Sequence, residues 1–252
     1  MNLTGNTIFI TGGGSGIGRA LAEQLHQRGN KVINGGRRKN HLARAIEANP
    51  GMDSLEIDIT NPQSVVEASR NLIMNYPELN VLINNAGLML IDDAATVIDE
   101  ELLVSTIETN LVGTIRLTGV LIEHLKAQQS STVMIVSSVL GFTPMAMTAV
   151  YSSTKAALHS YAQSLRFKLR NTSVRVLEVI PPWVRTELLN SSKEPRAMPL
   201  EEFIEGALKG LATDADEIMV PRAAFLRSQV GIDEARFVRS FNEELEPAPV
   251  VA

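Results

Sequence analysis

Short runs of β-branched and apolar residues alternate with helix-length segments through most of this 252-residue chain. The strand-like runs are TIFITG (7–12), KVINGG (31–36), SLEIDI (54–59), NVLINN (80–85), TVMIVSS (132–138) and VRVLEVI (174–180). Helix-length segments lie near 17–29, 38–48, 62–75, 99–128 and 151–171. Strands that are separated by helices pair in parallel through right-handed crossovers, so this alternation predicts an α/β fold.

The predicted architecture is a single-domain, Rossmann-type doubly wound parallel sheet with helices on both faces. The run VMIVSS (133–138) is apolar over most of its length, as expected for a strand that helices cover on both sides. No internal repeat or Pro/Gly-rich linker divides the chain, so one domain is expected over 1–252.

The pattern changes after Ile180, where four prolines fall within twenty residues. Ligands of doubly wound folds bind beyond the carboxyl ends of the strands, so a substrate-binding loop and helix are expected at about 182–212. Beyond it we expect a short strand at 217–220, a helix near 222–243 and a frayed tail from 245 to 252.

Composition excludes several classes of function. The chain has 44% hydrophobic and 20% charged residues, as in soluble globular proteins, and its net charge of −5 shows no basic cluster for nucleic acid. It has no cysteine, which excludes disulfides, thiolate catalysis and cysteine-bound metals. No secretory signal or membrane-spanning apolar run is evident, so a cytoplasmic location without a membrane partner is expected.

The four histidines give no metal-ligand pattern, and no metal site is predicted. They are expected to be surface or helix-packing residues in four separate helical segments, at His26, His41, His124 and His159.

A glycine-rich loop, TGGGSGIG (11–18), joins the first predicted strand to the first predicted helix. In this context its N–H groups and the positive helix end can face a pyrophosphate, whereas a lone glycine-rich turn would be weak evidence. We therefore expect a dinucleotide-binding domain. The expected contacts in this loop are Gly12, Gly14, Ser15, Gly16, Ile17 and Gly18.

The end of the second strand favours NADP over NAD. Gly36 stands where NAD-selective enzymes usually carry an acid, and Arg37 and Arg38 follow, although such a turn can equally be solvated surface. Asp58, at the end of the third strand, could cap the next turn or receive the adenine amino group.

Tyr151 and Lys155 lie one turn apart on the predicted helix 151–171. One explanation is a lysine that extends to solvent from an amphipathic helix. The other is acid chemistry, because a nearby cation favours the phenolate and lowers the pKa of a tyrosine. This segment alone does not decide between the two.

Taken together and in this order, the motifs resemble those of the short-chain dehydrogenase/reductases. They are TGGGSGIG (11–18), NNAG (84–87), Asn110, Ser138 and YSSTK (151–155), and the resemblance covers about residues 5–190. It implies an oxidoreductase that binds NADP or NAD and has a Ser-Tyr-Lys site.

The resemblance assigns a role to each catalytic residue. Tyr151 would be the general acid and base, and Lys155 would lower its pKa and bind the nicotinamide ribose. Ser138 would hydrogen-bond the substrate oxygen, and Asn110 would hold a water that connects Lys155 to solvent. From the residues alone, Ser138 could be a strand-end turn serine, and Asn110 could bond only the neighbouring backbone.

The resemblance also extends the cofactor cleft. Asn84 would brace the sheet. The further cofactor contacts would be Asn85, Ala86 and Gly87 near the adenosine ribose, Tyr151 and Lys155, and Pro181, Val184 and Thr186 beyond the sixth strand.

One motif departs from the family. Where Pro-Gly is common, this chain has Pro181-Pro182 followed by Trp183, which makes the loop stiffer and adds an aromatic side chain. This variant is similar to a DltE-like bacterial branch of the family.

The leading hypothesis is a carbonyl reductase or alcohol dehydrogenase that interconverts a ketone and a secondary alcohol. A hydrophobic substrate, such as an aryl ketone, is expected because apolar residues flank the motifs: Leu88, Met89, Leu90, Val139, Leu140, Met145, Met147 and Trp183. The alternatives are a noncatalytic dinucleotide sensor or scaffold and an extended epimerase, which would need a larger C-terminal part. The segments 99–128 and 151–169 could pair with copies of themselves, so a homotetramer or dimer is expected.

Overall fold

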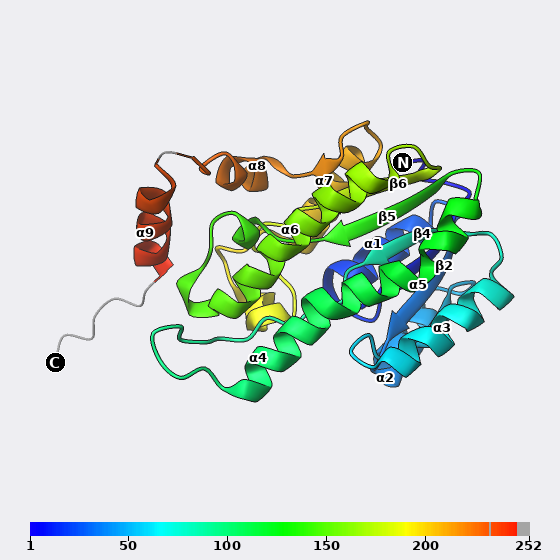
Figure 1. Ribbon diagram of the computed structural model, residues 1–252, viewed down its shortest axis with the longest axis horizontal. Coiled ribbons are helices and arrows are strands. Elements are labelled where there is room, and N and C mark those ends of the chain that lie inside the picture. Colours follow the sequence, from blue (N-terminus) through cyan, green and yellow to red (C-terminus); the bar gives the residue numbers. More distant parts are fainter. Residues whose placement is uncertain (232, 246–252) are drawn as a thin grey trace.

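The computed structural model describes residues 1–231 and 233–245, and its strands form one parallel sheet (Figure 1). The strand order is β3-β2-β1-β4-β5-β6-β7, and all six pairings are parallel. The strands are β1 (Thr7–Thr11), β2 (Lys31–Gly36), β3 (Asp53–Glu56), β4 (Leu79–Asn84), β5 (Ser131–Val136), β6 (Val174–Val179) and β7 (Glu217–Ile218). The order reverses between β1 and β4, which is where doubly wound folds bind ligands. The predicted fold is therefore confirmed.

Helices cover both faces of this sheet (Figure 1). The helices are α1 (Gly16–His26), α2 (Lys39–Ala48), α3 (Pro62–Asn75), α4 (Glu100–Ile107), α5 (Gly113–Ala127), α6 (Ala149–Leu169), α7 (Leu200–Leu211), α8 (Pro221–Arg227) and α9 (Glu234–Leu245). The shorter helical segments are a π-helical turn, η1 (Glu108–Val112), and three 3₁₀ segments, η2 (Val139–Gly141), η3 (Ala146–Thr148) and η4 (Leu188–Lys193). No helix among these described segments is both long and apolar enough to cross a bilayer.

The side chains of each strand alternate between two hydrophobic cores. In β5, Met134 belongs to the core that contains α1 and α7, whereas Val133 and Ile135 belong to the core that contains α3, α5 and α6. This alternation decides which helix each strand residue faces.

Several predicted elements differ from the structure, and the third strand, predicted at 54–59, is β3 at Asp53–Glu56. The predicted helix 99–128 is interrupted by η1, and the strand predicted at 217–220 is only two residues long. The helix predicted near 222–243 is divided into α8 and α9, and between them Gly231 has a φ of +148°, a conformation that other residues rarely adopt. The fraying predicted for the tail lies, beyond Leu245, outside the described residues.

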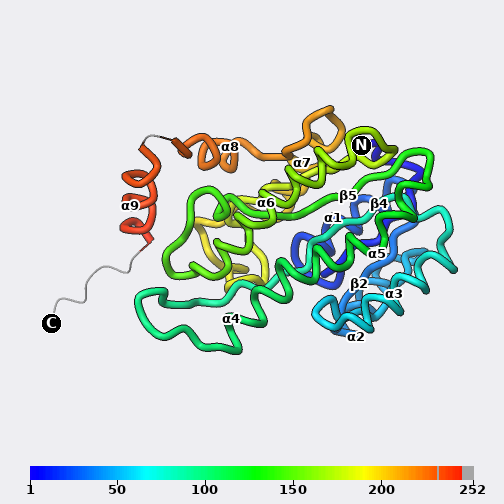
Figure 2. Tube along the Cα trace, viewed as in Figure 1, coloured from blue at the N-terminus to red at the C-terminus, as the bar shows by residue number. Residues whose placement is uncertain are grey.

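The two last helices return to the carboxyl ends of the strands (Figure 2). The Asn242 side chain donates to the Pro144 carbonyl at 3.0 Å and accepts from the N–H of Ala146, in the loop that leads to α6. The C-terminal part of the chain therefore lies beside the segment that follows β5.

Candidate functional site

A cavity of about 680 Å³ opens where the strands end, and it brings together segments that are far apart in the sequence. Most of the residues predicted for the site line it. They are Gly12, Gly14, Ser15, Gly16, Ile17, Arg37, Arg38, Asp58, Asn85, Ala86, Gly87, Ser138, Tyr151, Lys155, Pro181, Val184 and Thr186. Gly18 and Asn110 do not line it, and their contacts explain why.

The glycine-rich loop needs glycine for two different reasons. Gly12 and Gly16 have φ values of +69° and +53°, in the left-handed region that disfavours a Cβ. Gly18 is buried under the loop instead, where a Cβ would lie 2.2 Å from Asn85 Nδ2 and 2.5 Å from the Gly12 carbonyl oxygen. Gly18 thus lets the loop, α1 and β4 pack closely.

The N-terminus of α1 is arranged to receive an anion. The side chain of the N-cap residue Ser15 makes no capping hydrogen bond, and the first turn contains no acidic residue. The free N–H groups and the positive end of the helix therefore stay uncompensated beside the glycine-lined cavity wall. These features fit the pyrophosphate of a dinucleotide.

Two arginines lie at the end of β2, where the sequence predicts the adenosine. Arg38 donates to Ser15 Oγ at 2.8 Å, and Arg37 Nη1 lies 4.0 Å from Asp58 Oδ2. Asp58 Oδ1 accepts from the backbone N–H and the hydroxyl of Thr60, so Asp58 does cap its turn. Both arginines are more than half exposed in the cavity mouth, which fits an additional phosphate group on the ribose.

The NNAG segment is fixed by the end of β1. Thr11 Oγ1 accepts from the backbone N–H groups of Asn85 and Ala86, and Asn85 Nδ2 donates to the Thr11 carbonyl. Asn84 instead donates to Thr118 Oγ1 at 3.0 Å, so it braces β4 against α5, as expected. The cavity therefore meets Asn85 and Ala86 but not Asn84.

Ser138, Tyr151 and Lys155 converge in the part of the cavity beyond β5. Each is at most 6% exposed. Ser138 lies two residues beyond β5 and caps η2, where its Oγ accepts from the N–H of Leu140 at 3.1 Å. Lys155 Nζ donates to the Val136 carbonyl at 2.8 Å and lies 5.4 Å from the centroid of the Tyr151 ring.

Burial shifts the pKa values of Tyr151 and Lys155 in opposite directions. Burial raises the pKa of Tyr151 to about 12, and a hydrogen bond with Ser138 acts in the opposite direction. The Lys155 ammonium lies 5.4 Å from the centroid of the Tyr151 ring, a distance at which a cation favours the phenolate, and its effect on the Tyr151 pKa stays a prediction. Burial also lowers the pKa of Lys155 to about 8, against the effect of the Glu178 charge. Tyr151 is thus a protonated donor at neutral pH.

Asn110 lies in the π-helical turn η1 and is fully buried. Its Oδ1 accepts from the N–H of Leu88 at 2.7 Å, and its Nδ2 donates to the Leu88 carbonyl and to Thr154 Oγ1. The side chain thus clamps the segment after β4 to α6, rather than bonding only its own helix. π-Turns of this kind occur often at functional sites.

Six of the eight predicted apolar residues line the cavity, namely Leu88, Met89, Val139, Leu140, Met145 and Trp183. Leu90 and Met147 do not; they are 40% and 39% exposed on the surface instead. Three further apolar residues come from α8 and α9: Leu226, Phe241 and Leu245. The sequence predicted a helix near 222–243 but gave no indication that this part of the chain contributes to the cavity wall.

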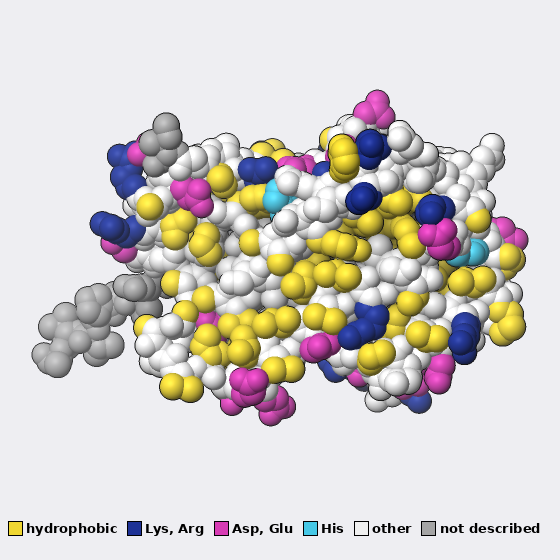
Figure 3. Space-filling model, viewed as in Figure 1, with side chains coloured by type: hydrophobic (Ala, Val, Ile, Leu, Met, Phe, Trp, Pro, Cys, Tyr) yellow, Lys and Arg dark blue, Asp and Glu magenta, His cyan; other side chains and the backbone are white. Residues whose placement is uncertain are grey.

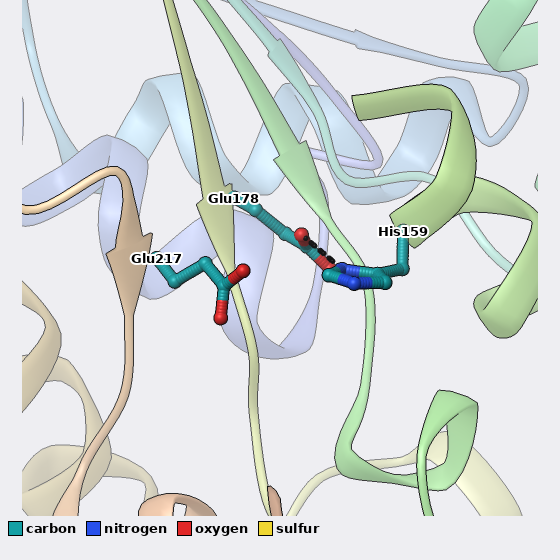
Figure 4. A group of neighbouring side chains, drawn as sticks. All are labelled: His159, Glu178 and Glu217. Atoms are coloured by element: carbon teal, nitrogen blue, oxygen red, sulfur yellow. Dashed lines mark hydrogen bonds and ion pairs between the residues drawn. The ribbon is translucent and has the colours of Figure 1, made fainter. Parts of the chain in front are cut away.

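A second group of side chains was not predicted at all. His159, Glu178 and Glu217 come from α6, β6 and β7, and their ligand atoms lie within 4.8 Å of one another (Figure 4). His159 is therefore more than a surface or helix-packing residue, because its Nδ1 bonds Glu178 at 2.8 Å. No local spacing could have indicated this group, since each member lies on a different element.

The chain matches known proteins over most of its length. A family model described as short chain dehydrogenase matches residues 6–197. The oxidoreductase DltE of Bacillus subtilis (strain 168) is 36% identical over 251 residues, covering 97% of this chain and 99% of DltE. This similarity confirms the resemblance to DltE.

Solved structures extend the comparison to the fold. A short chain dehydrogenase from Burkholderia cenocepacia J2315, in complex with NADP, has a TM-score of 0.84 at 28% identity over 98% of this chain and 100% of its own. The 3-ketoacyl-(acyl-carrier-protein) reductase from Brucella melitensis, complexed with NADH, has a TM-score of 0.77 at 25% identity over 88% of this chain and 94% of its own.

Proposed function

This chain belongs to the short-chain dehydrogenase family, and on that premise we propose that it interconverts hydrophobic ketones and secondary alcohols with NADP as the preferred cofactor. The proposal depends on one observation: a single cavity joins the glycine-rich loop at α1 to Ser138, Tyr151 and Lys155. A dinucleotide on the loop and a substrate carbonyl beside the tyrosine would therefore share one enclosed space.

The residues that would hold the dinucleotide follow from the site. The loop of Gly12 and Gly16 with the N-terminus of α1 would bind the pyrophosphate, and Arg37 and Arg38 would bind a 2′-phosphate. Lys155 would bind the nicotinamide ribose. Thr186, Pro181 and Val184 line the cavity beyond β6, where the nicotinamide carboxamide is expected. When bound, the nicotinamide supplies or accepts the hydride.

The chain's own residues would manage the proton. As a ketone is reduced, negative charge develops on its oxygen, and Tyr151 would donate its hydroxyl proton to that oxygen. Ser138 would donate a second hydrogen bond to the same oxygen. Lys155, through the water proposed beside Asn110, would return a proton to the tyrosine. In the reverse direction, Tyr151 would act as the base.

The substrate is proposed from the cavity lining. Apolar side chains from the segments after β4 and β5 and from α8 and α9 surround the space beside Tyr151. Of the segment predicted at 182–212, the loop with Trp183 and Arg196 lines the cavity and would form one wall, whereas α7 packs into the core that contains α1. Because apolar side chains predominate in this lining, a hydrophobic ketone such as an aryl ketone is the proposed substrate class.

Initial-rate measurements with one aryl ketone test the proposal. We expect ketone-dependent oxidation of NADPH, with a lower KM for NADPH than for NADH. Arg37→Ala and Arg38→Ala should raise the KM for NADPH by about tenfold while changing that for NADH little, because each removes a contact to the 2′-phosphate.

Tyr151→Phe completes the test. It should lower kcat by at least about a hundredfold and change NADPH binding much less, because the aromatic ring and the other cofactor contacts remain while the proton-donating hydroxyl is removed. Turnover that is unchanged in Tyr151→Phe would reject the mechanism. Dinucleotide binding without turnover on a broad panel of ketones and alcohols would instead support a noncatalytic sensor.

We also propose that the protein is a cytoplasmic homodimer or homotetramer. The absence of cysteine is compatible with a reducing compartment, and apolar side chains on α4, α5 and α6 are exposed in the single chain.

A further inference from the structure

Glu178 is a carboxylate within the core of the protein, and the proposed proton transfer does not use it. It lies on β6, is 0% exposed, and is flanked by the buried side chains of Leu177 and Val179. Side chains two residues apart on a strand lie on the same face of the sheet, and Val176 belongs to the core that contains α6. The Glu178 side chain therefore also lies on the face that α6 covers. Burying a carboxylate is unfavourable unless hydrogen bonds and charges compensate it. Its contacts therefore explain its presence.

Both carboxylate oxygens of Glu178 are hydrogen-bonded. Oε1 accepts from Ser137 Oγ at 2.5 Å, and Oε2 accepts from His159 Nδ1 at 2.8 Å (Figure 4). The other ring nitrogen, His159 Nε2, lies 2.8 Å from Gln163 Nε2, which donates to it when Nδ1 carries the ring proton. A chain of hydrogen bonds thus runs from the exposed Gln163 to the buried end of β5.

These contacts join the two elements that carry the reacting groups. Ser137 directly precedes Ser138 at the end of β5, so its bond to Glu178 holds the backbone from which the Ser138 hydroxyl projects. His159 lies one turn after Lys155 on α6, so the other oxygen of Glu178 is bonded to the face of α6 that carries the lysine.

The charge of Glu178 acts on the same lysine. Burial lowers the pKa of Lys155 to about 8, and the negative charge of Glu178 opposes that change. The titratable or charged groups that the described residues place beside Glu178 also include His159, Glu217 on β7, and Arg227 on α8, whose Nε lies 3.6 Å from the Glu217 carboxylate. Glu217 therefore has a cation of its own, whereas Glu178 faces the histidine and the lysine.

Metal binding is a competing explanation for His159, Glu178 and Glu217, since each offers a ligand atom. The hydrogen bonds favour a proton-linked network instead. Both oxygens of Glu178 and both nitrogens of His159 already have partners within the chain, and Glu217 is paired with Arg227.

We propose that Glu178 is a positioning residue for the oxidoreductase reaction: its bond to Ser137 fixes the Ser138 hydroxyl, and its charge faces the Lys155 ammonium. The proposal rests on the function proposed above. His159 holds the carboxylate in place and connects it to the surface of α6.

Glu178→Gln tests both parts, because glutamine has the same shape but no charge. We expect kcat for ketone reduction to fall by about ten- to a hundredfold, since small displacements of reacting groups have effects of this size. The KM for the ketone should stay within about threefold, because the substrate contacts remain. Glu178→Asp, which keeps the charge, should recover part of kcat. Glu217→Gln is the matched control and should stay within about twofold of the unmodified protein.

A titration provides a readout other than activity. In protein labelled with [ε-¹³C]lysine, the Lys155 resonance, assigned by its loss in Lys155→Met, should titrate about one pH unit lower in Glu178→Gln. An unshifted titration together with an unchanged kcat would overturn the proposal. Absence of ketone turnover in the unmodified protein would reject the proposed function instead, and the titration would still report on Glu178.

Two further measurements cover the remaining outcomes. If Glu178→Gln does not fold, Ser137→Ala replaces it, and an unchanged kcat in that variant would refute the positioning of Ser138. Zn²⁺ that stabilises the unmodified protein against thermal unfolding, but not Glu217→Gln, would overturn the proposal in favour of a metal site.

Discussion

At the scale of single residues, the protonation of Tyr151 and Lys155 sets what the site can do at a given pH. The raised pKa of the phenol keeps its proton in place at neutral pH, and the lowered pKa of the amine brings its loss of charge close to neutrality. Tyr151 therefore stays protonated over the neutral pH range, whereas the charge of Lys155 changes within it.

Ketone reduction and alcohol oxidation should therefore differ in their pH profiles. Reduction needs the neutral phenol of Tyr151, and with a pKa of about 12 this phenol stays protonated throughout the neutral range. The kcat for ketone reduction should therefore be constant from about pH 6 to 7.5. It should decline as pH rises through about 8, because Lys155 then loses its charge. Alcohol oxidation needs the phenolate and should accelerate as pH rises from 7. Initial rates in both directions measure this, and a reduction rate that increases steadily to pH 9 would contradict it.

Alanine substitutions at two helical glycines, Gly18 on α1 and Gly119 on α5, should change the stability of the protein in opposite directions. A Cβ at Gly18 meets Asn85 and the Gly12 backbone, whereas a Cβ at Gly119 on α5 has nothing within 4 Å. Gly18→Ala should lower the free energy of unfolding by about 1–3 kcal/mol through overpacking and weaken dinucleotide binding. Gly119→Ala should raise stability by about 0.5–1 kcal/mol, because alanine favours a helix. Urea unfolding checks both, and equal effects would refute the packing argument.

At the scale of elements, α6 is the helix on which the site depends, and its start is held from another segment. Thr148, its N-cap residue, makes no side-chain capping bond. Instead Asp92, in the loop after β4, accepts from the N–H groups of Ala149 and Val150 at 3.0 Å each. Tyr151 is the next residue, so this cap bears on the position of the phenol.

Asp92→Ala should therefore affect stability and catalysis together. Loss of the cap should lower the free energy of unfolding by about 1–2 kcal/mol, and fraying of the first turn should reduce kcat several-fold. Asp93→Ala is the control, because Asp93 is exposed and caps only its own loop. Thermal unfolding and ketone reduction measure the two effects. If stability falls while kcat stays unchanged, the first turn of α6 does not need Asp92 to place Tyr151.

The elements also show how far the sequence could predict the fold. Periodicity located the strands of the sheet and the helices α1 to α3 to within about three residues at each end, because a strand or helix pattern is a local property. It could not locate η1 or the break at Gly231. Asn110 bonds Leu88 and Thr154 across long sequence separations, and these tertiary contacts are made in the π-turn.

At the scale of the whole molecule, one face exposes apolar side chains over α4, α5 and α6 (Figure 3). Val104, Ile115 and Val120 are at least 38% exposed, and Phe167 is 63% exposed with Arg170 stacked on its ring. Apolar patches of this kind on enzymes often become covered by a second copy of the chain.

We expect light scattering at micromolar concentration to give the mass of a dimer or tetramer. Val120→Asp combined with Phe167→Asp should reduce that mass to that of the single chain, because charges cannot be buried without partners in an interface. Met74→Asp, which changes an exposed methionine on α3, is the control. A monomer of unmodified protein would refute the expected assembly.

The sequence by itself determined the order of the elements. Hydrophobic period and glycine positions are local properties, and they were enough to predict the parallel sheet and the loop at Gly12–Gly18. The expectation that Ser138, Tyr151 and Lys155 form one site came from the resemblance of the motifs to those of the short-chain dehydrogenase/reductases. Only the tertiary structure decided which distant groups support that cluster. Asp92 at the start of α6, Glu178 between Ser137 and His159, and the C-terminal helices over the cavity are brought there by packing of the whole chain. The N–H groups that Asp92 accepts from and the burial that Glu178 needs partners for arise only when segments far apart in the sequence come together in the fold.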